Sequence, residues 1–138
     1  MRVYLAAAMT NPTRDLDILG RLLEHVERGG HLVPTRHVAL ADGKRRDLSI
    51  TDAELAQRDL DWLASCDALV AEVSTPSHGV GVEVMAAVGR RMPVLLLHRD
   101  GAPVSRLLLG LPGIERRAYR SSDEACELAA EFLTALAG

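Results

Sequence analysis

The chain has 138 residues, of which 48% are hydrophobic and 25% charged, and its formal net charge is −3. These values are typical of one globular domain, here residues 1–138, and they exclude a largely disordered chain. The basic residues are dispersed and no apolar run reaches the length of a membrane span, so we expect neither a nucleic-acid partner nor a membrane protein.

The N-terminus has no secretory signal pattern, which predicts a cytoplasmic protein. Cys66 and Cys126 lie far apart among apolar residues. This spacing favours free, buried thiols over a disulfide or a metal centre. We therefore expect no metal.

The first third of the chain predicts a strand, a helix and a second strand. Residues 2–8 are apolar and β-prone, which is typical of a buried strand. Asn11-Pro12 predicts a helix start, as N-cap and first helical residue, and Gly29-Gly30 predicts its end. Residues 31–34 predict a short second strand. The polar segment 36–49 that follows fits either a lid or a solvated surface loop.

The next helix, predicted over residues 51–66, contains an unusual acid. Thr51 and Glu54 form a capping-box pattern at its start. Asp59 lies four residues from apolar positions on either side, so it falls on the apolar stripe, whereas Arg58 falls on the polar face. A carboxylate on that stripe is costly unless it is paired, hydrogen-bonded or facing a cavity. Asp59 is therefore either satisfied by a buried donor or catalytic.

A second candidate site follows the strand predicted over residues 68–73. The segment 77–83 contains Gly79 and Gly81 and precedes a helical pattern, which predicts a strand, a turn and a helix. Glycines let backbone N–H groups approach a ligand, and a helix start favours anions. Glu83 is expected in the first helical turn, where the helix dipole keeps a carboxylate ionised. It is either a base or nucleophile, or simply complements the dipole.

The rest of the chain continues the alternation of strands and helices. We expect strands over 93–97 and 114–119, a short helix around 104–108, and a last helix that residues 121–124 cap. The whole pattern predicts an α/β fold with a five-stranded, parallel, doubly wound sheet in the order 2-1-3-4-5.

Ligands of such sheets bind beyond the carboxyl ends of the strands, where the strand order reverses. The loop after the first strand, from Ala7 to Thr10, should therefore face the 77–83 turn. Asp59 precedes the third strand by one helix. We expect it to reach the same crevice.

Several motifs follow the order and spacing of a known family. They are Tyr4-Leu5-Ala6, Thr35-Arg36-His37-Val38, Gln57-Arg58-Asp59-Leu60-Asp61-Trp62-Leu63, Ala71-Glu72-Val73-Ser74 and Pro76-Ser77-His78-Gly79-Val80-Gly81-Val82-Glu83. Over nearly the whole chain they resemble the 2'-deoxynucleoside 5'-phosphate N-hydrolase family of the nucleoside 2-deoxyribosyltransferase superfamily. The resemblance implies cleavage of the N-glycosidic bond of a nucleoside 5'-monophosphate to free base and sugar phosphate, without a cofactor.

The resemblance also implies roles for individual residues. Glu83 matches the nucleophile, Asp59 the general acid and Tyr4 the residue that orients the nucleophile. Ser77 matches a phosphate ligand, and Ser105 a second one donated by the neighbouring subunit of a homodimer. Breaking an N-glycosidic bond needs one ionised carboxylate and one proton donor. In apolar surroundings the pKa of Asp59 should be raised, which suits the donor.

The loop after the first strand departs from the family, whose hydrolases place a serine and an arginine there to hold the phosphate. Here only the hydroxyl of Thr10 is available, so Arg14, His78 or residues 44–46 are the candidates to compensate. His37 matches a pocket histidine or serves packing alone. The expected substrate-binding set is Ser77, Gly79, Gly81, Ser105, His37, Thr10 and Ala7.

Three other functions stay open. The first is a deoxyribosyltransferase that passes the sugar to a second base, and the second is a variant that hydrolyses ribonucleotides such as CMP. The third is a nucleotide-binding module without turnover.

Overall fold

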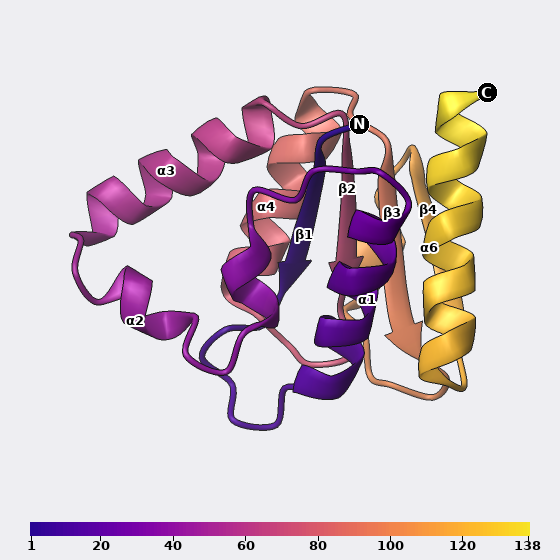
Figure 1. Ribbon diagram of the computed structural model, residues 1–138, viewed down its shortest axis with the longest axis horizontal. Coiled ribbons are helices and arrows are strands. Elements are labelled where there is room, and N and C mark those ends of the chain that lie inside the picture. Colours follow the sequence, from indigo (N-terminus) through magenta and orange to yellow (C-terminus); the bar gives the residue numbers. More distant parts are fainter.

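The computed structural model describes all 138 residues and has a parallel sheet with helices on both faces (Figure 1). The four strands, in their order across the sheet, are β1 (Val3–Ala7), β2 (Ala68–Glu72), β3 (Val94–Arg99) and β4 (Ile114–Tyr119). The helices are α1 (Leu16–Arg28), the 3-10 helix η1 (Arg36–Ala39), α2 (Lys44–Asp47), α3 (Asp52–Ala64), α4 (His78–Gly89), α5 (Arg106–Leu109) and α6 (Ser122–Ala137). The predicted α/β class is confirmed.

Side chains of β1 alternate between two hydrophobic cores, one on each face of the sheet. Val3 and Leu5 belong to the core that α1 and α6 cover. Tyr4 belongs to the opposite core, together with side chains of α3 and α4. Figure 1 shows α1 and α6 side by side on one face and α4 on the other. The alternation therefore places the Tyr4 side chain on the α4 face.

The predicted five strands in the order 2-1-3-4-5 are wrong, since the sheet has four strands in the order 1-2-3-4. Residues 31–34 form only one parallel bridge, to Arg2. Pro34 has no N–H to extend the ladder. Beyond it the Thr35 hydroxyl accepts from Leu5 N (3.0 Å) and donates to Leu5 O (2.7 Å). A side chain thus replaces the second strand at this edge of β1.

The first helix begins later than predicted. Asp15, and not Asn11, caps α1, because its carboxylate accepts hydrogen bonds from the backbone N–H groups of Asp17 and Ile18. Asn11 instead accepts from the backbone and the hydroxyl of Thr13 in a local turn. The loop after β1 is consequently longer than the sequence indicated.

Helix α4 begins earlier than predicted. The Ser77 hydroxyl accepts from Val80 N and caps the helix, which starts at His78. Gly79 and Gly81 therefore lie inside the helix and not in a turn before it. Glu83 falls in the second turn, which corrects its expected place in the first.

Helix α3 extends away from the sheet, as Figure 1 shows. The predicted capping box is confirmed, since Thr51 and Glu54 exchange side chain to backbone hydrogen bonds. Leu63 is the one residue of α3 that is buried. The helix therefore contacts the sheet mainly near its C-terminal end.

The predicted edge strand over 114–119 is confirmed as β4. The predicted cap of the last helix is also confirmed, because the Ser121 hydroxyl accepts a hydrogen bond from Glu124 N. Cys66 and Cys126 are free and buried, as expected. No helix is both long and apolar enough to cross a membrane.

Candidate active site

The Tyr4 and Glu83 side chains meet on the α4 face of the sheet. The Tyr4 hydroxyl donates a 2.7 Å hydrogen bond to Oε1 of Glu83. Strand β1 holds Tyr4 with 1% of its surface exposed, and the second turn of α4 presents Glu83 to it. The hydrogen bond fixes one carboxyl oxygen of Glu83.

Burial raises the pKa of Glu83 to about 7, and the charge of Asp59 adds to the increase although the Tyr4 hydrogen bond opposes it. The expectation that the helix dipole keeps this carboxyl ionised is therefore wrong. The dipole acts mainly within the first turn, and Glu83 lies beyond it. At pH values below about 7 the free protein holds a proton on Glu83.

Asp59 lies in the same environment as Tyr4 and Glu83. Its charge contributes to raising the pKa of both groups above their usual values, in each case after burial as the largest cause. Asp59 is not in apolar surroundings, however. The Arg58 guanidinium binds its Oδ1 through Nε (2.9 Å) and Nη2 (2.8 Å). An ion pair, and not a buried backbone donor, compensates this carboxylate.

Arg58 also reaches a second carboxylate. Its Nη2 lies 2.9 Å from Oδ1 of Asp47, at the end of α2. The guanidinium carbon stands 4.6 Å from the centre of the Trp62 ring, one helical turn further along α3. Arg58, expected on the polar face of α3, thus lies over Trp62 and between two carboxylates.

His37 completes this side of the site. It is buried, its ring centre lies 5.6 Å from that of Trp62, and its Nε2 lies 3.9 Å from Oδ1 of Asp47. Burial lowers the pKa of His37. The imidazole is therefore mostly neutral near pH 7 and offers one donor and one acceptor.

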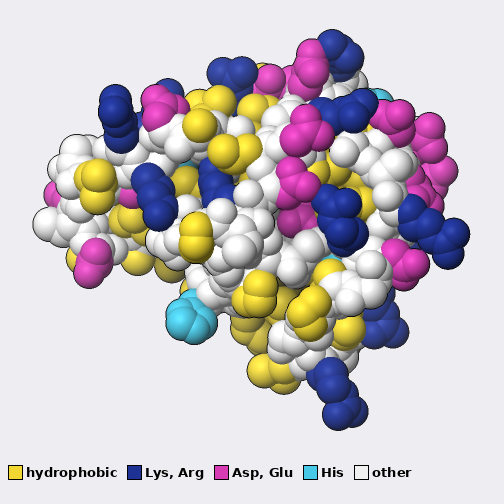
Figure 2. Space-filling model, turned by 90° about the horizontal axis from the view of Figure 1, so that it is seen from below, with side chains coloured by type: hydrophobic (Ala, Val, Ile, Leu, Met, Phe, Trp, Pro, Cys, Tyr) yellow, Lys and Arg dark blue, Asp and Glu magenta, His cyan; other side chains and the backbone are white.

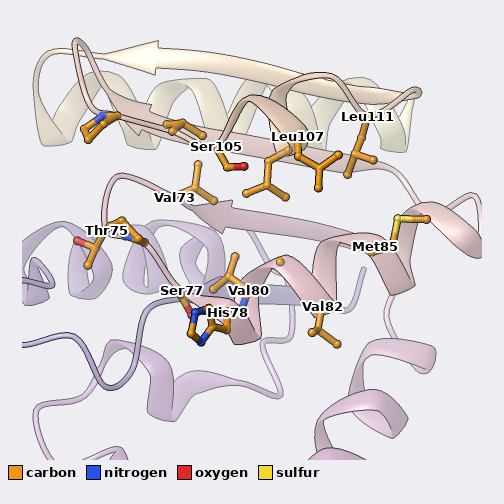
Figure 3. A pocket seen from close by; sticks show the side chains of 15 residues that line it. Val73, Thr75, Ser77, His78, Val80, Val82, Met85, Ser105, Leu107 and Leu111 are labelled. Carbon is orange, nitrogen blue, oxygen red and sulfur yellow. Dashed lines mark hydrogen bonds between the residues drawn. The ribbon is translucent and has the colours of Figure 1, made fainter.

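Ser77 and Ser105 line a different hollow, of about 610 Å³, between α4 and the segment that carries α5. Figure 3 shows the two serines on facing walls, with Leu107 and Leu111 on one side and Val82 on the other. Glu83, Asp59 and Tyr4 do not line it. This hollow is thus separate from the acid pair, and Ser77 lines it from the start of α4, the helix that also carries Glu83.

The loop after β1 contributes a small hollow of about 240 Å³ lined by Thr10, Arg14 and Lys44 among others. Arg14 is held by the carbonyl oxygens of Ala8 (2.8 Å) and Leu40 (2.9 Å).

Ala7, a predicted substrate-binding residue, does not line this hollow. Its methyl group packs in the core on the α1 face of the sheet. Any contact of Ala7 with a substrate can come only from its backbone.

Sequence reasoning missed Arg58 and Asp47. Arg58 could have been recognised from its spacing of four residues to Trp62, which places the two side chains on one face of a helix. Asp47 gave no such signal, because its contact with Arg58 joins residues from separate helices. No group of three or more His, Cys, Asp or Glu side chains is placed to hold a metal ion.

Comparison with known proteins identifies the family. Residues 3–130 match the sequence model of the nucleoside 2-deoxyribosyltransferase family. The chain belongs to this family. The resemblance inferred from the motifs is confirmed.

Two relatives and one solved structure illustrate the range of similar proteins. A Thermofilum pendens protein provisionally named 2'-deoxynucleoside 5'-phosphate N-hydrolase 1 is 39% identical over 131 residues, covering 92% of this chain and 91% of its own. The 5-hydroxymethyl-dUMP N-hydrolase of Esox lucius is 30% identical, covering 80% of this chain and 79% of its own. The structure of the CMP N-glycosidase of Clostridium botulinum shares the fold, with a TM-score of 0.73 and 19% identity over 96% of this chain and 99% of that one.

Proposed function

We propose that this chain is a nucleotide N-glycosidase that hydrolyses 2'-deoxynucleoside 5'-monophosphates to free base and 2-deoxyribose 5-phosphate. The names of its relatives support the substrate class. The observation that carries the proposal is the Tyr4–Glu83 hydrogen bond with the charge of Asp59 acting on both groups. Two carboxyl groups in one environment are the minimum equipment for glycosidic cleavage.

In the first step the Glu83 carboxylate attacks the anomeric carbon of the sugar. The bond from that carbon to the base nitrogen breaks, its electron pair goes to the base, and Asp59 gives the base a proton. Sugar and Glu83 are then joined by an ester. In the second step Asp59 takes a proton from water, whose oxygen attacks the anomeric carbon and releases Glu83 as a carboxylate.

The first step needs Glu83 without a proton and Asp59 with one. Below about pH 7 the Glu83 carboxyl is protonated, and Arg58 is paired with Asp59. The reaction needs the opposite arrangement, so activity should depend on apparent pKa values that belong to the pair. Tyr4, whose pKa is raised by burial and by Glu83, remains a donor throughout.

We also propose a homodimer with residues 1–138 as one domain per subunit, located in the cytoplasm. Val82, Met85 and Leu107 are 62%, 53% and 79% exposed around the hollow that holds Ser77 and Ser105. Yellow side chains also gather on part of the face shown in Figure 2. A second copy packed on Val82, Met85 and Leu107 would cover this apolar surface. It would also bring its own Ser105 to the phosphate of the substrate.

Transfer of the sugar to a second base is the alternative that the family description favours. It passes through the same ester on Glu83, with a base in place of water as the acceptor. The residues described here serve both reactions.

The test is to incubate the protein with deoxynucleoside monophosphates, CMP and unphosphorylated nucleosides, and to measure free base by chromatography. We expect base from the deoxynucleotides. A new nucleoside on addition of a second base would favour transfer, release from CMP alone would favour the ribonucleotide variant, and no base from any substrate would favour a binding module.

A further inference from the structure

Arg58 joins two carboxylates that come from separate parts of the chain. One guanidinium nitrogen, Nη2, lies 2.8 Å from Oδ1 of Asp59 and 2.9 Å from Oδ1 of Asp47. The three side chains are about equally exposed, at 22%, 21% and 20% for Arg58, Asp59 and Asp47. Water screens such a partly buried cluster less than a surface ion pair.

The packing around Arg58 limits where its guanidinium can go. The group lies over Trp62, which in turn contacts His37. Arginine is well suited to this position because its planar group can stack on an aromatic ring and still donate in its own plane. The orientation of Asp59 thus depends on a fixed donor.

Because Asp47 contacts Arg58, the segment that precedes Asp47 in the chain is held near Arg58. Gly43 is buried where an added Cβ would stand 2.0 Å from the carbonyl oxygen of His37, so this backbone lies directly against η1. Residues 44–46 are exposed, and they are Lys, Arg and Arg. The 44–47 segment has one ion pair, between Asp47 and Arg58, and Asp47 also lies 3.9 Å from the largely neutral His37 ring.

We propose that Arg58 is the positioning residue of Asp59 and that, through Asp47, it ties the 44–47 segment to the acid that serves the departing base. The inference rests on the proposed function for the part that concerns catalysis. Arg58 fixes the Asp59 carboxyl for proton donation in the first step and for proton removal from water in the second. The segment closes one side of the site only while the tie is intact.

Charged and titratable groups from four other elements act on Arg58 and Asp59. They are Tyr4 of β1, His37 of η1, Arg46 and Asp47 of α2, and Glu83 of α4. The pH profile of a variant without Arg58 therefore reflects several groups and not Asp59 alone.

The tie is tested without reference to activity by trypsin cleavage after residues 44–46, followed by mass spectrometry. Arg58→Met keeps the aliphatic cover on Trp62 and removes the donors. We expect cleavage about fivefold faster or more than in the wild type. Arg28→Met, which removes a helical arginine paired with Glu24 elsewhere, is the matched control and should cleave at the wild-type rate.

The positioning role is tested by kinetics. Arg58→Met should lower kcat by about 10- to 100-fold with little change in KM, and Asp47→Asn should lower it less. In an Asp59→Asn background the loss of Arg58 should change kcat by less than about twofold, because Arg58 acts through Asp59. Arg28→Met should leave kcat unchanged.

A nitrophenyl 2-deoxyriboside 5-phosphate separates positioning from a merely structural role, since its leaving group departs without a proton. We expect Arg58→Met to regain a nearly wild-type rate of nitrophenol release in the first turnover, because only the later hydrolysis of the ester then needs Asp59. An equal loss on both substrates, or additive effects of Arg58→Met and Asp59→Asn, would overturn the positioning role. Unchanged trypsin cleavage would overturn the tie, whereas a wild type that releases no base would count against the proposed function and leave the cleavage result to decide the tie.

Discussion

The two flanks of helix α4 differ in chemistry although the same three turns carry both. One flank presents Glu83 to Tyr4, in the environment of Asp59. The other presents Val82 and Met85 to an apolar hollow. Between them Val80, Val84 and Ala87 are buried against the sheet. A helix with a single ionisable side chain after its first residue thus has one polar flank and one apolar flank.

Replacing Glu83 should break the polar flank and give the largest effect. Glu83→Gln keeps the size of the side chain and an oxygen that can accept from Tyr4, but removes the carboxylate that we propose as the nucleophile. We expect base release to fall by at least about 1000-fold with an unchanged circular dichroism spectrum. Near-normal turnover in this variant would contradict the assigned role, and Glu127→Gln on the exposed side of α6 is the control.

The same variant should alter stability in a pH-dependent way. The pKa of Glu83 is 4.5 in the unfolded chain and is raised to about 7 in the folded protein. As the pH rises between these two values, Glu83 ionises more readily in the unfolded chain, so the free energy of unfolding falls. Glu83→Gln avoids that cost. Its free energy of unfolding should match the wild type at pH 4 and exceed it by up to about 3 kcal/mol at pH 8. Urea unfolding at both pH values measures this, and a constant difference would contradict it.

The apolar flank can be broken at Leu107, whose side chain is 79% exposed in the single chain. A charge there should weaken a dimer that buries it by about 2 kcal/mol per subunit. We expect Leu107→Glu to sediment as a monomer where the wild type sediments as a dimer. Leu32→Glu, at an exposed leucine on the opposite edge of the sheet, should not change the sedimenting mass. A wild type that sediments as a monomer would contradict the proposed dimer.

Substitution of two glycines, one in α4 and one before α2, should have the smallest effects, and these are on stability. Gly81 has no atom within 4 Å of an added Cβ, so Gly81→Ala should raise helix stability by up to about 1 kcal/mol. Gly43→Ala should destabilise the protein, because its Cβ would meet the carbonyl oxygen of His37 at 2.0 Å. Thermal unfolding of the two variants should therefore shift in opposite directions.

Local patterns were sufficient for much of the fold. The capping box of Thr51 and Glu54, the Ser121 cap and the strand over 114–119 all depend on residues within a few positions of one another. The missing strand at 31–34 could not be read in this way. Its place is taken by the hydrogen bonds of Thr35 to Leu5, thirty positions earlier in the chain.

The motifs by themselves determined the family and pointed to Tyr4, Asp59 and Glu83, because residue types at fixed spacing are a property of the sequence. Only the tertiary structure decided the electrostatic state of these groups. Burial raises the pKa of Glu83, against what its helix position had predicted, and Arg58 pairs with Asp59 where apolar surroundings had been expected. Desolvation and ion pairing depend on what surrounds a group in space, and for this site those neighbours come from β1, α2, α3 and α4.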